Sequence, residues 1–176
     1  MFSRLAIQKN RGTLFLDLDG VFADFSRGVE DLMGRHPDEL VEAQMWKKLS
    51  ERGTRDTFYA GLHPMPGAKA LWSYCEKFNP IILTGVPHQL AQEASEQKHR
   101  WFPRNIGRAR MICCYTSDKP NYIQGKGDTL VDDRERNRAP WVAAGGIFIL
   151  HQTVPKTINE LKRAGWEGSM RHYTFD

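Results

Sequence analysis

Five short apolar runs are spaced along the chain, and segments with helical character lie between them. Strands that are buried on both faces have continuous apolar sequences, and helices supply the crossovers that parallel strands need. The runs span Thr13–Leu16, Ile81–Leu83, Met111–Tyr115, Thr129–Val131 and Ile147–Leu150. This alternation predicts an α/β fold in which a parallel sheet is covered by helices on both faces.

Local signals predict where the helices lie. Helices are expected over 66–78 and 88–102, and a shorter one over 137–144, where Gly145 and Gly146 follow. Thr153, with Pro155 two residues later, can start a last helix.

The stretch between the first two predicted strands, residues 24–62, is far longer than a usual crossover. Segments 37–49 and 54–60 look helical, so we expect a small helical cap at 24–62, inserted into an α/β core domain formed by 1–23 and 63–176. Four aromatic side chains of the insertion are available to face inward: Phe25, Trp46, Phe58 and Tyr59. The pattern fits a lid over the sheet and a fixed, packed excursion equally well.

The composition indicates a soluble, cytoplasmic protein. No apolar run approaches the ~20 residues that a membrane span needs, and Met1–Arg11 lacks the apolar block of a secretory signal. Two of the three cysteines, Cys113 and Cys114, are neighbours that cannot conveniently bridge each other, so no disulfide framework is expected. The net charge of +4 favours an anionic ligand only weakly, because dispersed basic residues are common on surfaces.

Reactive side chains follow four of the predicted strands. In open parallel sheets, ligands bind beyond the carboxyl ends of the strands. The residues found there are Asp17 and Asp19 after the first run, Thr84 and Gly85 after the second, Lys119 after the third, and Asp132 and Asp133 after the fourth. We therefore expect carboxylates, a hydroxyl and an ammonium group to meet in one pocket.

Several carboxylates in one pocket repel one another unless a cation compensates, and a set of oxygen ligands suits Mg²⁺. We predict a magnesium site formed by Asp17, the Asp19 region and the Asp132-Asp133 pair. Zinc is disfavoured because the six histidines and three cysteines show no ligand spacing.

The same residues can carry out phosphoryl transfer. Asp17 could attack phosphorus to form an aspartyl-phosphate, with Asp19 acting first as general acid and then as general base. Thr84 and Lys119 would bind the remaining phosphate oxygens. Each motif alone has a structural explanation, since Asp-x-Asp-Gly is commonly a turn and a lone lysine is usually solvated. Their common position after buried strands favours a catalytic site.

Together, the four segments resemble the four motifs of the haloacid dehalogenase (HAD) superfamily. Asp17-Leu18-Asp19-Gly20-Val21 resembles the first motif, with nucleophile and acid/base in order. Thr84, Lys119 and the Asp132-Asp133 pair resemble the second, third and fourth motifs. The resemblance implies a three-layer Rossmann-like sheet and a magnesium ion held by the Asp17 side chain and the Asp19 backbone carbonyl.

Within the superfamily, most of the chain is similar to the 5'(3')-deoxyribonucleotidases. Residues 19–25 resemble that family's DGVLADF stretch and residues 98–101 its KYRW segment, and the similar segments also include 61–68, 117–119 and 127–134. The resemblance implies that Phe25 stacks on a nucleobase and that aromatic residues near Phe58 and Tyr59 shape the same pocket.

The chain departs from that family in two places. Gly85 stands where those enzymes have a serine, which removes one hydroxyl from the inferred phosphate site. The segment between Lys119 and Asp132 is longer, so Lys126 competes for the role of the third-motif lysine. We favour Lys119, because it follows the strand beside Asp118, whereas Lys126 lies between two glycines.

The expected function is magnesium-dependent hydrolysis of phosphomonoesters, specifically as a 5'(3')-deoxyribonucleotidase that acts on nucleoside monophosphates. An alternative is a phosphatase for another small phosphate ester or a nucleic-acid end. A non-catalytic binding or regulatory protein is a third possibility, which the presence of all four motifs disfavours. We expect a small-molecule partner rather than nucleic acid or a membrane, and the sequence leaves the oligomeric state open.

Overall fold

The computed structural model describes residues 12–168. Within this range, five strands form one parallel sheet in the order β3-β2-β1-β4-β5. The strands are β1 (Leu14–Leu16), β2 (Ile81–Gly85), β3 (Arg110–Cys114), β4 (Thr129–Asp132) and β5 (Ile147–Leu150). Every predicted apolar run forms a strand, so the predicted α/β fold is confirmed. The prediction about a leader in Met1–Arg11 and the end of the predicted core, 169–176, lie outside the described residues.

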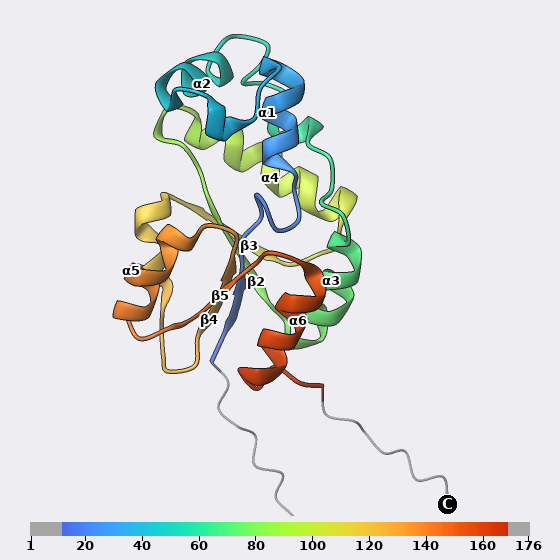
Figure 1. Cartoon of the computed structure of the whole chain (residues 1–176), viewed down its shortest axis with the longest axis vertical. Helices are drawn as coiled ribbons and strands as arrows, with labels where there is room; N and C mark the ends of the chain where they lie inside the picture. Colours follow the sequence, from blue (N-terminus) through green and yellow to red (C-terminus); the bar gives the residue numbers. More distant parts are fainter. Residues whose placement is uncertain (1–11, 169–176) are drawn as a thin grey trace, which may run out of the picture.

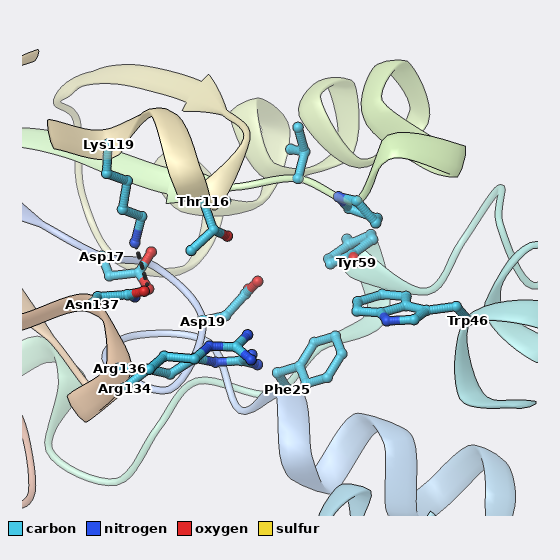
Figure 2. A pocket seen from close by; sticks show the side chains of 13 residues that line it. Asp17, Asp19, Phe25, Trp46, Tyr59, Thr116, Lys119, Arg134, Arg136 and Asn137 are labelled. Atoms are coloured by element: carbon cyan, nitrogen blue, oxygen red, sulfur yellow. Dashed lines mark ion pairs between the residues drawn. The ribbon is translucent and has the colours of Figure 1, made fainter. Parts of the chain in front are cut away.

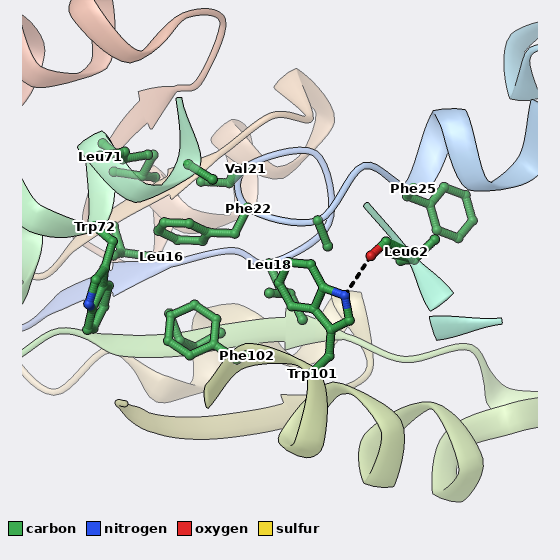
Figure 3. Close-up of a cluster of buried hydrophobic side chains, with 14 of the residues drawn as sticks. Leu16, Leu18, Val21, Phe22, Phe25, Leu62, Leu71, Trp72, Trp101 and Phe102 are labelled. Atoms are coloured by element: carbon green, nitrogen blue, oxygen red, sulfur yellow. Dashed lines mark hydrogen bonds between the residues drawn. The ribbon is translucent and has the colours of Figure 1, made fainter. Parts of the chain in front are cut away.

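Helices cover both faces of the sheet (Figure 1). Within β1, Leu14 and Leu16 belong to one apolar cluster and Phe15 to another, because successive strand residues point to opposite faces. The first cluster, part of which Figure 3 shows, lies under α3 (Ala68–Cys75), α4 (Ala91–Asn105) and α6 (Val154–Arg163). The second includes Trp141 of α5 (Arg138–Ala143). The result is a three-layer, Rossmann-like arrangement.

The predicted core helices are present, and 3-10 turns extend several of them. These turns are η3 (Glu76–Phe78), η4 (His88–Leu90) and η6 (Glu135–Asn137), and η5 (Thr116–Tyr122) follows β3. As predicted, Thr153 begins the last helix, since its side chain accepts a hydrogen bond from the Lys156 backbone N–H.

Residues 24–62 form helical elements that lie beyond the carboxyl edge of the sheet (Figure 1). The elements are α1 (Phe25–Met33), η1 (Pro37–Glu39), α2 (Glu42–Leu49) and η2 (Tyr59–Gly61). The chain enters and leaves this segment side by side, because the Met65 backbone N–H donates to Phe22 O at 2.7 Å and that of Asp24 donates to His63 O at 2.8 Å.

The helices within this segment differ from those predicted. The segment 37–49 is not one helix, because Leu40 and Val41 have extended backbone between η1 and α2. The segment 54–60 is a series of turns that ends in η2. Gly53 has a left-handed backbone, and its carbonyl accepts a hydrogen bond from the Thr57 hydroxyl, so local side-chain bonds compete with a helix there.

Two further predictions concern membranes and cysteines. In the described part of the chain, no helix combines the length and the apolar character needed to cross a membrane. Cys75, Cys113 and Cys114 are all free, in agreement with the predicted lack of a disulfide framework.

Candidate active site

A cavity lies at the carboxyl edge of the sheet, between the strand ends and the helices of residues 24–62 (Figure 2). Its walls come from three sources: the strand ends, the aromatic side chains of the inserted segment, and the loop after β4. The lining residues are Asp17, Asp19, Gly85, Val86, Pro87, Thr116 and Lys119; Phe25, Trp46 and Tyr59; and Arg134, Arg136 and Asn137.

Three of the predicted carboxylates converge at this edge. One ligand atom from each of Asp17, Asp132 and Asp133 lies within 4.8 Å of the others. Asp17 directly follows β1, and its backbone N–H donates to Val131 O at 2.9 Å, so the β1–β4 pairing fixes its position. A cluster of oxygen ligands with this spacing can hold a divalent cation such as Mg²⁺.

Asp132 and Asp133 have different surroundings. Both oxygens of Asp132 are occupied, because Oδ1 accepts from the Arg134 backbone N–H at 2.8 Å and Oδ2 from Lys119 Nζ at 2.7 Å and Asn137 Nδ2 at 2.9 Å. In contrast, Asp133 Oδ1 is buried and has no hydrogen-bond partner among the described residues. A buried carboxylate oxygen without a donor is costly, and a bound cation would remove that cost.

Of the two lysines that compete for the third-motif role, Lys119 is buried beside the carboxylate cluster, whereas Lys126 is exposed on the loop before β4. The buried Lys119 Nζ lies 3.1 Å from Asp17 Oδ2 and bonds to Asp132 as well. Burial opposes the charge on this lysine, but the two carboxylates outweigh burial and raise its pKa above the ordinary value. Lys119 therefore remains a cation beside Asp17.

Two carboxylates of the cluster, Asp17 and Asp133, hold protons more tightly than usual in the absence of a cation. Burial, which leaves Asp17 5% exposed, raises its pKa to about 6 despite the nearby Lys119. Burial and the neighbouring Asp17 and Asp132 raise the pKa of Asp133 to about 7. Desolvation and like charges both favour the neutral form of these two acids.

Asp19 lies apart from this cluster and pairs with a different lysine. Its Oδ2 accepts a hydrogen bond of 2.6 Å from Lys98 Nζ, while its Oδ1 is buried without a partner. The Asp19 carboxylate lines the cavity on the side that faces Phe25 and Arg134 (Figure 2). Gly20, which follows, has φ +75°, and a Cβ there would collide with the Asp133 carboxylate.

Of the two residues at the end of β2, Gly85 lines the cavity and Thr84 does not. The Thr84 hydroxyl does not line the cavity and accepts a hydrogen bond of 3.0 Å from Lys98 Nζ. Gly85 does line the cavity, and a Cβ on it would collide with Thr116 Oγ1. The Thr116 hydroxyl therefore occupies the space that a side chain at position 85 would need.

Three aromatic side chains form the wall opposite the carboxylates (Figure 2). Phe25 and Tyr59 are largely buried, and Trp46, which lies 6.1 Å from Phe25 between ring centroids, completes the wall. Phe58 does not line the cavity. It contacts Phe25 edge-on at a centroid distance of 5.5 Å and supports the wall from behind.

Several residues at the site were not predicted as its members: Thr116, Arg134, Arg136 and Asn137 line the cavity, and Lys98 bonds to the lining residue Asp19 from behind. Arg134, Arg136 and Asn137 lie within five positions of Asp132, so an extended search of each strand end would have found them. Lys98 follows no strand end, because it reaches the site from the middle of α4, and the KYRW-like segment 98–101 marked it without giving it a role.

Comparison with protein-family models finds no match for this chain, and comparison with curated proteins finds no significant one. Solved structures do resemble it. A hydrolase from Streptococcus pneumoniae TIGR4 has 12% sequence identity and a TM-score of 0.50, over 86% of this chain and 99% of that one. A dehalogenase has 13% identity and a TM-score of 0.52, over 81% and 85% of the two chains.

A HAD family enzyme from Bacteroides thetaiotaomicron has 13% identity and a TM-score of 0.48, over 80% of this chain and 93% of that one. None of these three structures is described as a deoxyribonucleotidase. At such low identities the similarity concerns the fold. The chain shares its Rossmann-like α/β fold with the hydrolase and the dehalogenase.

Proposed function

We propose that this protein is a magnesium-dependent phosphomonoester hydrolase that forms an aspartyl-phosphate on Asp17. The observation that carries the proposal is the buried cluster of Asp17, Asp132 and Asp133 beside Lys119, at the sheet edge where ligands bind. A buried cluster of three acids has only one lysine to balance its charge. A divalent cation would supply the missing positive charge and could bind a phosphate ester at the same time.

The metal ligands would be Asp17 and Asp133, together with the Asp19 backbone carbonyl that the HAD resemblance implies. Asp133 fits this role because its Oδ1 is buried without a partner, whereas both Asp132 oxygens are already bonded. When bound, magnesium would supply positive charge that neutralises the phosphate oxygens. Asp132 would orient Lys119 and Asn137 instead, and Lys119 would stabilise negative charge on the phosphoryl group.

The reaction has two steps, and both aspartates of the first motif take part in each. An oxygen of Asp17 attacks phosphorus, and the bond to the leaving ester oxygen breaks as Asp19 gives that oxygen its proton. In the second step Asp19 takes a proton from water, whose oxygen displaces the phosphoryl group from Asp17. The products are an alcohol and inorganic phosphate, and both aspartates return to their starting states.

Residues 24–62 would form a small cap over a core of residues 1–23 and 63–176, and the cap would select the substrate. Support comes from Phe25, Trp46 and Tyr59, which place a largely apolar aromatic wall across the cavity from the carboxylates. Such a wall suits a flat, aromatic leaving group, so we assign nucleoside monophosphates as substrates and a 5'(3')-deoxyribonucleotidase activity.

The catalytic proposal is tested with Asp17→Asn, which keeps the size of the side chain but removes the nucleophile. We expect turnover of phosphate esters to be lost, by at least about 10³-fold, with the fold intact. Wild-type protein should need Mg²⁺ and should form an acid-stable phosphoryl adduct that Asp17→Asn lacks. Undiminished turnover by Asp17→Asn would disprove the covalent route.

The substrate is tested separately with a panel of nucleoside monophosphates and sugar phosphates. We expect nucleotides to have the higher kcat/KM, and Trp46→Ala to reduce this preference, because the ring is part of the aromatic wall of the cavity. Equal or better turnover of sugar phosphates would remove the nucleotide assignment and leave the phosphatase assignment intact.

A further inference from the structure

A second buried lysine, Lys98, lies directly behind the cavity. Its side chain is 1% exposed, and its Nζ donates to Asp19 Oδ2 at 2.6 Å, Thr84 Oγ1 at 3.0 Å and Gly85 O at 2.7 Å. An ammonium group has three N–H donors, so these contacts use all of them. Lys98 therefore has no donor left for a ligand, and it is not among the residues that line the cavity.

The contacts of Lys98 connect three separate parts of the site. Lys98 comes from α4, Asp19 from the loop after β1, and Thr84 and Gly85 from the end of β2. The Tyr59 ring covers the ammonium at 4.8 Å, and this ring also belongs to the cavity wall. A charged, desolvated hydrogen bond of this kind holds its partner in one orientation more firmly than a bond exposed to water.

The two carboxylate oxygens of Asp19 therefore differ in their hydrogen bonding. Oδ2 is held by Lys98, whereas Oδ1 has no hydrogen-bond partner among the described residues. Oδ1 is buried, but it belongs to a residue that lines the cavity and no donor holds it, so it is the oxygen available to exchange a proton with a leaving group or with water bound there.

We infer that Lys98 is a positioning residue that holds Asp19 through Oδ2 so that Oδ1 transfers the proton in both steps of the reaction. This inference rests on the proposed function. In the first step the proton moves from Asp19 Oδ1 to the ester oxygen as its bond to phosphorus breaks. In the second, Oδ1 accepts a proton from the water that attacks the phosphoryl group on Asp17.

The test compares two phosphate esters that differ in their need for a general acid. An alkyl ester such as a nucleoside monophosphate leaves as a basic alkoxide and needs the proton, whereas p-nitrophenyl phosphate leaves as a stable phenolate. For Lys98→Met we expect kcat/KM to fall about 100-fold for the alkyl ester, and less than about 3-fold for the nitrophenyl ester.

A second readout follows the next step. Lys98→Met should still be phosphorylated by p-nitrophenyl phosphate, but water should be activated slowly. We therefore expect a burst of about one equivalent of nitrophenolate per protein, followed by a slow steady state. Loss of kcat/KM by the same factor for both esters, or slowed turnover without a burst, would overturn the inference.

Gln97→Met is the matched control. Gln97 is buried on the same turn of α4, and it bonds to the backbone of Arg55 and Ala60 but does not touch Asp19. We expect Gln97→Met to alter stability or KM without changing the ratio of kcat/KM between the two esters. A ratio changed as much as in Lys98→Met would show that Lys98 acts only through general packing.

Lys98→Gln covers the case in which Lys98→Met does not fold. Its amide can still donate to Thr84 and Gly85 but cannot carry the charge that holds Asp19. We expect the same selective loss for the alkyl ester, and an equal loss for both esters would contradict the inference. If wild-type protein hydrolyses neither ester, the proposed function fails. If wild type is active and the variants lose both esters equally, only the role of Lys98 fails.

Discussion

Two adjacent aspartates at the end of β4 have different contacts, although the sequence gives them equal standing. Asp132 is fully buried and joins Lys119 and Asn137 through Oδ2. Asp133 has a raised pKa and an oxygen without a donor. The first arrangement stabilises the folded chain by itself, whereas the second is unfavourable until a cation binds.

Substituting each aspartate by asparagine should therefore give opposite results. Asp132→Asn breaks the buried pair with Lys119, so we expect unfolding free energy to fall by about 3–5 kcal/mol without Mg²⁺. Asp133→Asn should leave the metal-free protein as stable as the wild type or more stable, and should abolish the increase in Tm that Mg²⁺ causes. Thermal unfolding with and without Mg²⁺ measures both, and a normal Mg²⁺-induced shift in Asp133→Asn would contradict the assignment.

Position 85 offers a second test at the level of single side chains. Gly85→Ser should impair both stability and turnover, because its Cβ would collide with Thr116 Oγ1. Adding Thr116→Ala removes that oxygen and leaves the new serine hydroxyl in nearly the same space. We expect the double variant to regain most of the lost Tm and kcat/KM. A double variant no better than Gly85→Ser would show that the two side chains do not share this space.

At the level of elements, the sheet was predictable, but the individual helices of the inserted segment were not. Buried parallel strands are continuous apolar runs, and all five of them were found from that pattern. The helix α1 was not predicted, because only Phe25 and Val29 among its residues are buried. Its signals are local ones: the Asp24 side chain accepts from the Arg27 backbone N–H, and Gly34 ends the helix in a left-handed conformation.

The inserted segment is attached to α4 by buried hydrogen bonds. The indole N–H of Trp101 donates to Leu62 O at 2.8 Å (Figure 3), and the Gln97 side chain bonds to the backbone of Arg55 and Ala60. These contacts hold the C-terminal part of the insertion, including Tyr59, against the core. Any opening of the cavity should therefore involve α1 and α2 rather than residues 55–62.

A pair of tryptophan variants tests this attachment. Trp101→Phe leaves the buried Leu62 carbonyl without its donor, while Trp141→Phe removes an indole N–H that has no partner among residues 12–168. Both lose a similar volume from a buried position. We expect Trp101→Phe to cost about 1–3 kcal/mol more in unfolding free energy than Trp141→Phe, measured by urea denaturation. Equal costs would mean that the Leu62 bond does not anchor the segment.

For the whole molecule, the sequence predicted which strand ends meet but not how their side chains pair. The order of a parallel sheet brings β1, β2 and β4 together, so Asp17 and the Asp132-Asp133 pair had to converge. Lys98 could not be predicted as a partner of Asp19, because the pairing depends on how α4 packs over the sheet. Side chains that enter from a covering helix are set by tertiary packing, which short motifs do not encode.

The carboxylate cluster should also make the stability of the whole protein depend on pH and Mg²⁺ together. The folded-state pKa values of Asp17, about 6, and Asp133, about 7, lie above the ordinary value of 3.8. At pH values between 3.8 and these raised pKa values, the two carboxyl groups hold protons in the folded chain that they have lost in the unfolded chain. Their contribution to the stability of the folded state therefore decreases as the pH rises. Without metal, we expect their contribution to Tm to be larger at pH 5.5 than at pH 7.5.

Magnesium should reverse this trend, because it binds the deprotonated carboxylates and competes with protons. The increase in Tm caused by Mg²⁺ should therefore be larger at pH 7.5 than at pH 5.5. In Asp133→Asn, the metal-free pH dependence should shrink and the Mg²⁺ effect should disappear, because one proton site and one ligand are lost together. Calorimetry at the two pH values provides the measurement. An Mg²⁺-induced shift of equal size at both would place the ion away from Asp17 and Asp133, at groups that are already ionised at pH 5.5.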